Sequence, residues 1–202
     1  MKPVRLTRAQ QQARTRENLL KAAEEVFARL GYGGASVDLI AAEAAYSKGA
    51  VYSNFANKEA IFLELARRHM ERDFSELEEI LRRSDGQIEE AVAEWFRHMH
   101  DRADFPALVI ELELHARRSP EFAAGFYGLQ AQKLEALGQI IAKYFAYRGE
   151  TPPLAVADLA RIFDALGNGL ALQVAPRGPG EPNESGRIMY RLLEGLMVRR
   201  PA

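Results

Sequence analysis

The chain contains no cysteine. Disulfides, thiol catalysis and thiolate metal sites are therefore excluded. The opening residues MKPVRLTRAQQQARTR lack the apolar core of a signal peptide. The most apolar later stretch, Leu154 to Val174, is interrupted by Asp158, Arg161 and Asp164, which makes it too polar for a membrane span. We therefore expect a cytoplasmic protein with no membrane partner.

Strand signals are also missing. No stretch alternates apolar and polar residues as a half-buried strand does, and we find no repeat or low-complexity region. The 202 residues, 48% apolar and 27% charged, are typical of a soluble globular protein with one large or two small domains. Apolar residues recur instead at helical spacing, so the sequence predicts an all-α fold with about nine helices.

Acidic residues are absent before Glu17. Residues 1–58 carry nine Lys and Arg against five Asp and Glu, a net charge of +4. Residues 59–202 carry 18 cations against 23 anions, a net charge of −5. A basic head on an acidic body suits a polyanion partner at one end, although a solvated basic tail would give the same pattern.

The first helix begins at Thr15 or Thr7 and carries an apolar stripe that ends at Leu30. Gly31 follows as its stop signal. No strand precedes the glycines of Gly31 to Gly34, so we interpret them as a turn and not as a phosphate-binding loop.

Two short helices joined by a tight turn are predicted between Ser36 and Lys58. Ser36 can cap the first, and Ser47 can cap the second. The second helix buries Val51 and Phe55. Its other face would expose small, hydroxyl, amide and cationic side chains, the types that meet phosphates and base edges in the major groove. These residues are Lys48, Gly49, Ala50, Tyr52, Ser53 and Asn54. The pattern predicts a helix-turn-helix DNA-binding unit.

Six further helices form a body. Their start and stop signals are Asn57 as a cap, Ser119-Pro120 and Thr151-Pro152 as starts, and a Pro- and Gly-rich loop from Pro176 to Asn183. The expected ranges are Asn57 to about Arg83, Gln87 to about Arg102, Asp104 to about Arg118, Ser119 to about Tyr147, Thr151 to about Ala175, and Glu184 to about Arg199.

The segments AAEEVFARLGY and SVDLIAAEAAYSKGAVYSNFANKEAIF within residues 16–65 resemble the N-terminal domain of the tetracycline-repressor (TetR) family. The stretch DALGNGLAL, Asp164 to Leu172, is similar to part of that family's penultimate helix. Two positions differ from the family pattern. Ala45 stands where the turn glycine is usual, and Tyr46 stands where a small aliphatic residue is usual.

The resemblance implies a homodimeric transcriptional regulator, a repressor released from a pseudo-palindromic double-stranded DNA operator by a small effector. Residues 1–57 would bind DNA, and residues 58–202 would bind the effector and form the dimer through the last two helices. No cofactor is expected. Phosphate contacts carried over from the family fall on Ser36, Ser47, Tyr52 and Lys58; core packing beside Phe55 is the alternative for Tyr52.

The C-terminal helices suggest close packing on another subunit. Gly167, Gly169 and Ala171 are small residues in an apolar helix. The last helix is apolar around much of its circumference, so it needs two partners, one of which can be another subunit. An unusually buried helix in a monomer is the alternative.

Large aromatic and apolar groups in the body suggest a pocket for an apolar or aromatic molecule with a few polar anchors. Plain core packing is the alternative for each of them, and for His115 a satisfied core or surface position. The candidates are Trp95, Phe96, Met99, His115, Phe126, Phe163 and Asn168.

Catalytic and metal sites find little support. Glu111 and Glu113 are two apart on a helix and face apart, as do His98 and His100. No nucleophile–base pair is visible, so we expect no enzyme. The remaining alternative is a helical DNA-binding protein with a structural role, whose body binds protein partners and no small effector.

Overall fold

The computed structural model describes residues 7–83, 86–98, 105–173 and 183–197. Within these ranges all regular structure is helical, which confirms the predicted fold class. The nine helices found there are α1 (Arg8–Gly34), α2 (Val37–Glu43), α3 (Lys48–Tyr52), α4 (Lys58–Leu81), α5 (Ile88–His98), α6 (Phe105–Ala116), α7 (Pro120–Tyr147), α8 (Val156–Gln173) and α9 (Glu184–Gly195).

Local signals in the sequence determine where α1 begins and where it is interrupted. Thr7, and not Thr15, caps α1: its side chain accepts from the Gln10 amide, and the Gln10 side chain accepts from the Thr7 amide. Gly31 interrupts α1 with φ +68°, a conformation that glycine adopts without steric cost. The helix is therefore broken at Gly31 as expected, but α1 continues beyond the break to Gly34, where a turn was expected.

The observed boundaries of the later helices agree less closely with the predicted ones. Ser119 stands at the start of α7 as expected, but its side chain makes no capping hydrogen bond. Helix α8 begins at Val156 and not at Thr151. A residue that precedes a proline is pushed out of the helical region, so Pro152 and Pro153 delay the start until the Ala155 carbonyl accepts the first helical amides. The expected ends at Arg102, Ala175 and Arg199 lie outside the described residues.

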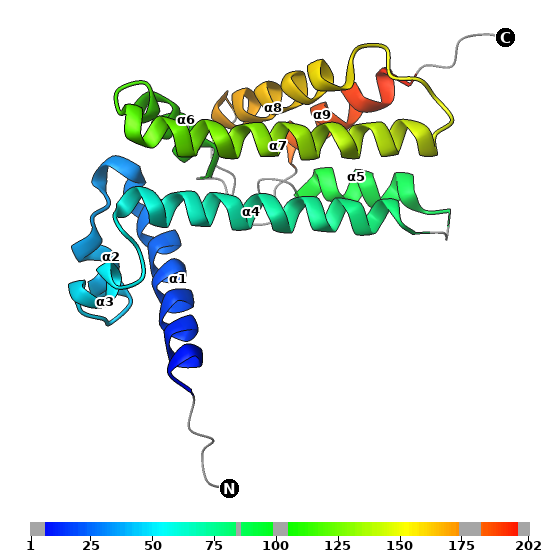
Figure 1. Ribbon diagram of the computed structural model, residues 1–202. Coiled ribbons are helices and arrows are strands. Elements are labelled where there is room, and N and C mark those ends of the chain that lie inside the picture. The colour runs from blue at the N-terminus through cyan, green and yellow to red at the C-terminus, as the bar shows by residue number, and fades with distance from the viewer. Residues whose placement is uncertain (1–6, 84–85, 99–104, 174–182, 198–202) are drawn as a thin grey trace, which may run out of the picture.

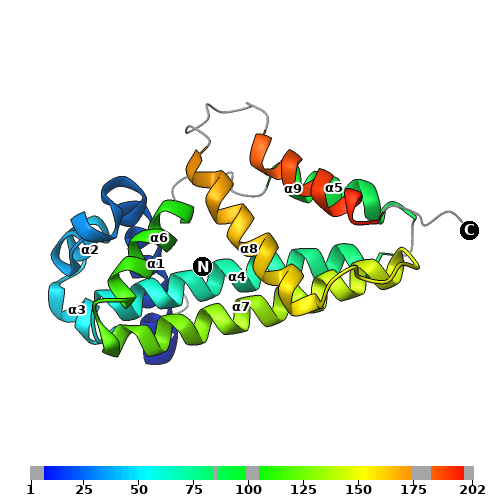
Figure 2. The same cartoon turned by 90° about the horizontal axis from the view of Figure 1, so that it is seen from above.

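Helix α4 joins the two ends of the molecule. Figure 1 shows α4 and α7 running side by side along its length, with α1, α2 and α3 at one end and α5 at the other. Seen from above, α8 lies across α7, and α9 lies beside α5 (Figure 2). We call α1, α2 and α3 the head, and the helices from α5 onward the body.

Two hydrophobic cores share α4. The first core joins the head to the start of α4 through Phe27, Ile40 and Phe62, and it also includes residues of α6 and α7. The second core lies in the body, where α5, α7, α8 and α9 meet around residues such as Phe145 and Leu159. Ile80, near the end of α4, belongs to this second core. A displacement of α4 therefore affects both cores.

Helix α9 packs against α5 and α8 of its own chain. A Cβ built on Gly186 would lie 1.8 Å from the Phe96 carbonyl oxygen, so the backbones of α5 and α9 approach very closely there. Met189, Leu193 and Met197 are buried, and Ile188, Leu192 and Leu196 are half-buried. Two neighbours in the chain thus cover part of the apolar surface of α9, and the pairing of the rest with a second subunit stays a prediction.

Candidate nucleic-acid interface

The head presents the helix-turn-helix that the sequence predicts. Ser36 caps α2 by accepting from the Leu39 amide at 3.2 Å, and Ser47 caps α3 by accepting from the Ala50 amide at 3.2 Å. Ile40 and Val51 are buried and anchor the two helices in the first core. Both predicted caps are confirmed.

The turn between α2 and α3 is a Schellman motif. The Tyr46 amide donates to the Ala41 carbonyl at 2.9 Å, and the Ala45 amide donates to the Ala42 carbonyl at 3.1 Å. This motif places its turn residue in the left-handed region, where glycine is usual. Here Ala45 occupies it with φ +57°. The chain therefore keeps the turn geometry without the glycine.

The outer face of α3 is open. Lys48, Gly49, Tyr52 and Ser53 are exposed, and Ala50 is half-buried. The Tyr52 side chain is 50% exposed, which argues against the core-packing alternative. A Cβ on Gly49 would meet only the Ser47 hydroxyl within 4 Å, so the backbone can come close to another molecule. This arrangement is compatible with the predicted DNA contacts.

Lys48 forms an ion pair across the two helices. Its ammonium lies 2.9 Å from Asp38 on α2, and both side chains are exposed. The hydrogen bond with Asp38 and the charge of that carboxylate raise the pKa of Lys48. The lysine therefore stays cationic, but part of its charge is balanced within the head.

Asn54 is placed differently from the expectation. Its side-chain amide nitrogen donates to the Ala50 carbonyl at 2.8 Å, and its Oδ1 atom is buried without a hydrogen-bond partner among the described residues. The expected exposure of this side chain on the reading face is therefore wrong. Asn54 lies just past the end of α3, where its amide group folds back on the helix.

Lys58 also differs. Its ammonium donates to the carbonyls of Tyr32 and Ala35 at 2.7 and 2.8 Å and lies 4.1 Å above the Tyr32 ring. Burial lowers the pKa of Lys58, although Glu59 and Glu111 oppose this effect. The side chain ties the start of α4 to the end of α1 and to its C-cap residue, Ala35. The phosphate contact that the family resemblance implies for Lys58 stays a prediction.

A cavity of about 780 Å³ has walls from α1 of the head, from α4, and from α5, α6, α7, α8 and α9 of the body. Five predicted pocket residues line it: Trp95, Phe96, Phe126, Phe163 and Asn168. Met99 is outside the described residues. The wall is largely apolar, and the volume is in the range of small-molecule sites.

His115 does not line the cavity, contrary to the prediction that it is a ligand anchor. Its Nε2 atom lies 2.7 Å from a Glu59 oxygen, and its ring packs against Tyr32 and Phe122. The residue therefore belongs to the contact between α6 and the start of α4. The alternative of a satisfied histidine describes it better.

Asn168 belongs to a polar group in the cavity wall, whose other two members, Lys133 and Asp164, were not predicted as site residues. Lys133 on α7 lies 2.5 Å from Asp164 on α8, and Asn168 donates to the same carboxylate at 3.4 Å. Asp164 and Asn168 are four apart on one helix, which is a readable signal, but Lys133 joins them only through the packing of α7 on α8. Together they offer polar anchors in an apolar wall.

Neither a metal cluster nor a membrane helix is found in the described ranges. No group of three or more His, Asp or Glu residues there is placed to hold a metal ion. No helix there is both long enough and apolar enough to cross a bilayer. Glu111 and Glu113 do face apart, because Glu111 binds the Tyr32 and Gly33 amides while Glu113 pairs with Arg117.

Fold and interface together define a helical protein with a helix-turn-helix head on a cavity-bearing body. Residues 19–65 match the model of "Bacterial regulatory proteins, tetR family". This stretch of the chain is therefore similar to the N-terminal part of that family, in agreement with the resemblance of its motifs.

Curated relatives share part of the sequence, and solved structures share the fold. The repressor AcnR of Corynebacterium efficiens is 30% identical over 132 residues, 64% of this chain and 65% of that protein. The repressor NicS of Pseudomonas putida is 31% identical over 125 residues, 58% of each chain. The matches thus span less than two thirds of these relatives. Salmonella enterica GusR has the same fold, with a TM-score of 0.71 at 21% identity over 95% of this chain and 97% of GusR.

Proposed function

We propose that the chain is a DNA-binding transcriptional repressor that leaves a two-fold symmetric operator when a small molecule enters its body. One observation carries this proposal: α4 starts in the core that holds the recognition helix α3 and then lines the cavity with Met70, Phe74 and Leu77. A molecule that prefers one placement of α4 can therefore change the DNA affinity by its differential affinity for the two states.

The DNA contacts follow the open face of α3. We assign phosphate contacts to Ser36, Ser47 and Tyr52. The hydroxyls of Ser36 and Ser47 accept capping hydrogen bonds and can still donate one, and Tyr52 is exposed. Lys48, Gly49, Ala50 and Ser53 would face the major groove. Asn54 and Lys58 are less favourable candidates for DNA contacts, because their side-chain nitrogens donate hydrogen bonds within the head.

The effector would be an apolar or aromatic molecule with a polar group that reaches Lys133, Asp164 and Asn168. Structures of the same fold have been solved with small molecules: FadR from Bacillus subtilis with stearoyl-CoA, and a regulator from Saccharomonospora viridis with choline. At 19% and 20% identity they support the fold of this chain alone. The cavity is what favours an effector over a purely structural role.

A dimer supplies the two-fold symmetry. Helix α8 leaves Ile162 and Leu172 exposed, and we propose that this surface, together with α9, pairs with a second subunit. Residues 1–57 would then read one half-site, and residues 58–202 would hold the effector and the partner. Half-sites about 34 Å apart would suit two recognition helices.

Selection from a random duplex library tests the proposal. The full chain should enrich a motif with two-fold symmetry, and its affinity should fall with salt, with about −0.9 added to the log–log slope for each neutralised phosphate. An asymmetric motif, or an affinity that does not depend on salt, would contradict it.

A thermal-shift screen with apolar and aromatic compounds tests the effector. A body that no compound stabilises would favour the protein-partner alternative.

A further inference from the structure

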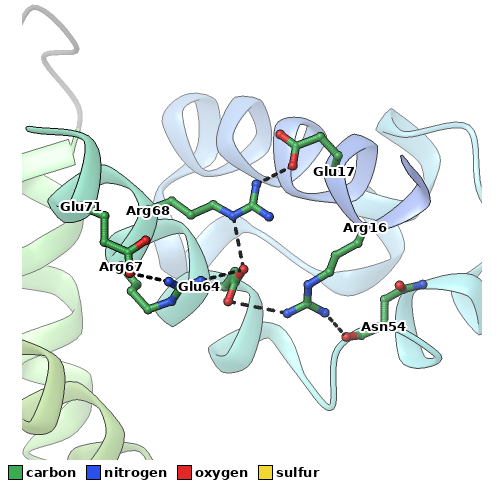
Figure 3. Close-up of polar contacts among 7 residues, drawn as sticks. All are labelled: Arg16, Glu17, Asn54, Glu64, Arg67, Arg68 and Glu71. Carbon is green, nitrogen blue, oxygen red and sulfur yellow. Dashed lines mark hydrogen bonds and ion pairs between the residues drawn. The ribbon is translucent and has the colours of Figure 1, made fainter. Parts of the chain in front are cut away.

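Arg16 on α1 joins three elements of the molecule. Its guanidinium donates to the Asn54 carbonyl, just past α3, at 2.5 Å and lies 4.1 Å above the Phe55 ring. The same group lies 3.6 Å from the Glu64 carboxylate on α4 (Figure 3). From the sequence alone, Arg16 is only one of the positive charges in residues 1–58. In the structure its guanidinium is committed to protein groups.

The Glu64 carboxylate forms ion pairs with three arginines. Besides Arg16, Arg67 and Arg68 each approach its carboxylate to 3.2 Å, and Arg68 also pairs with Glu17 on α1 (Figure 3). Burial alone would raise the pKa of Glu64, but the hydrogen bonds from Arg67 and Arg68 and the charge of Arg16 outweigh it and lower the pKa. Glu64 is therefore a carboxylate at neutral pH and can fix the Arg16 fork.

The recognition helix depends on such external contacts. Helix α3 spans only Lys48–Tyr52, which is too short to be stable alone. Val51 and Phe55 anchor one side of it in the first core. Arg16 holds the chain at its carboxyl end, through the Asn54 carbonyl. A planar guanidinium with donors in fixed directions suits this task better than an ammonium does.

We propose that Glu64 and Arg16 are positioning residues that set the orientation of α3 for DNA. Glu64 orients Arg16, and Arg16 holds the Asn54 carbonyl and the Phe55 ring. Because Glu64 lies on α4, a displacement of that helix reaches α3 through this pair. The inference rests on the proposed DNA-binding function, which it deepens by naming the residues that set the affinity.

The test compares Glu64→Gln with Glu71→Gln. Both variants remove one negative charge from α4, which by itself strengthens binding to a polyanion. Glu71 lies about two turns further along and, in Figure 3, pairs only with Arg67. We expect E64Q to bind the selected duplex roughly five- to thirtyfold more weakly than the wild type. E71Q should bind as well as the wild type or better, and binding to a random duplex should not weaken in either variant.

Arg16→Lys keeps the charge but loses the fork, so it should reproduce the E64Q defect. The double variant should then be no weaker than R16K, because Glu64 acts through Arg16. Thermal melts should stay within a few degrees of the wild type. If E64Q binds the selected duplex as E71Q does, or if it loses specific binding only in step with its melting temperature, the inference is wrong.

Hydrogen exchange gives a readout that needs no DNA. The amides of Ser53, Asn54 and Phe55 bond to carbonyls of α3, so their exchange reports how firmly its end is held. E64Q should speed their exchange while E71Q leaves it unchanged. Unchanged exchange in E64Q would overturn the positioning role. Faster exchange in a chain that selects no duplex would keep that role and reject the proposed function.

Discussion

Ala45 holds the turn of the helix-turn-helix in a conformation that a Cβ disfavours. Its φ of +57° lies in the left-handed region, where an L-residue other than glycine is strained by roughly 1–2 kcal/mol. The Schellman hydrogen bonds on both sides of Ala45 and the buried Ile40 and Val51 hold the turn in place. The departure from the family's turn glycine is therefore a local cost in stability, and the geometry of the head is kept.

Ala45→Gly should raise the free energy of unfolding by about 0.5–1 kcal/mol, because relief of the strain exceeds the added entropy of the unfolded chain. Urea unfolding followed by circular dichroism measures it. Ala42→Gly, inside α2, is the matched control and should lower the free energy of unfolding by about 1 kcal/mol. Equal losses in both variants would show that the turn at Ala45 carries no strain.

Tyr52→Phe removes one exposed hydroxyl from α3 and leaves the ring. We expect the affinity for the selected duplex to fall about two- to tenfold, the value of one ordinary hydrogen bond of about 0.5–1.5 kcal/mol at an exposed site. The salt slope should not change, because no charge is lost. Fluorescence anisotropy at several salt concentrations measures both quantities. Tyr127→Phe on α7, also exposed, should bind like the wild type; a Tyr52→Phe variant that does so too would remove this contact from the proposal.

At the scale of the elements, α6 is fastened to the last residues of α1, which follow its break at Gly31. The Glu111 carboxylate accepts from the Tyr32 and Gly33 amides at 2.8 and 3.1 Å. A Cβ on Gly31 would lie 2.8 Å from a Glu111 oxygen, so the glycine provides the room for this contact. Leu108 and Val109, one turn earlier on α6, line the cavity. The helix therefore touches both the cavity and the head.

Glu111→Ala should lower the free energy of unfolding by about 1–2 kcal/mol, because two backbone amides lose a charged acceptor at a partly exposed site. Glu113→Ala, two residues further on, should change it by less than about 1 kcal/mol, since its partner Arg117 is exposed. Chemical denaturation of both variants measures the difference. Equal effects would mean that the contact with the end of α1 contributes nothing beyond an exposed ion pair.

Signals within one helix were readable from the sequence, and contacts between helices were not. Caps at Ser36, Ser47 and Asn57 depend on a residue and an amide three positions later, so spacing alone predicts them. The carbonyl partners of Lys58 come from residues 32 and 35, and the partner of Arg16 comes from residue 54. Such pairs exist only once α1, α3 and α4 pack together. The sequence therefore predicted the helices and the reading face, but missed what holds that face in place.

At the scale of the whole molecule, the cavity lies where the two cores would otherwise meet. Its walls include Phe27 and Phe62 of the first core and Phe163 and Met189 of the second. Helix α4 contributes residues to these walls from Phe62, near its start, to Leu81 at its end. A bound molecule would therefore touch both cores at once. Under the proposed function, this placement would let a ligand in the cavity alter the head without any contact to DNA.

The exposed apolar surface of the molecule bears on its assembly. Helix α8 leaves Ile162 and Leu172 at 42% and 49% exposure, whereas the apolar residues of α9 are at least half-buried within the chain. A second copy related by a two-fold axis would bury the same residues from both subunits. The proposed dimer surface therefore centres on α8 more than the sequence suggested.

Ile162→Glu should convert the dimer to a monomer, because a two-fold interface would place two added carboxylates near each other in an apolar contact. The melting temperature should fall by no more than the loss of the dimer explains, since the side chain is 42% exposed in the single chain. Leu154→Glu, at a residue 50% exposed before α8, introduces the same charge and should leave the dimer intact. Sedimentation equilibrium of both variants, and anisotropy on a full operator and on a single half-site, measure the outcome. Loss of full-operator affinity together with retained half-site binding would place the two-fold axis at α8, whereas a dimeric Ile162→Glu variant would move the interface elsewhere on the molecule.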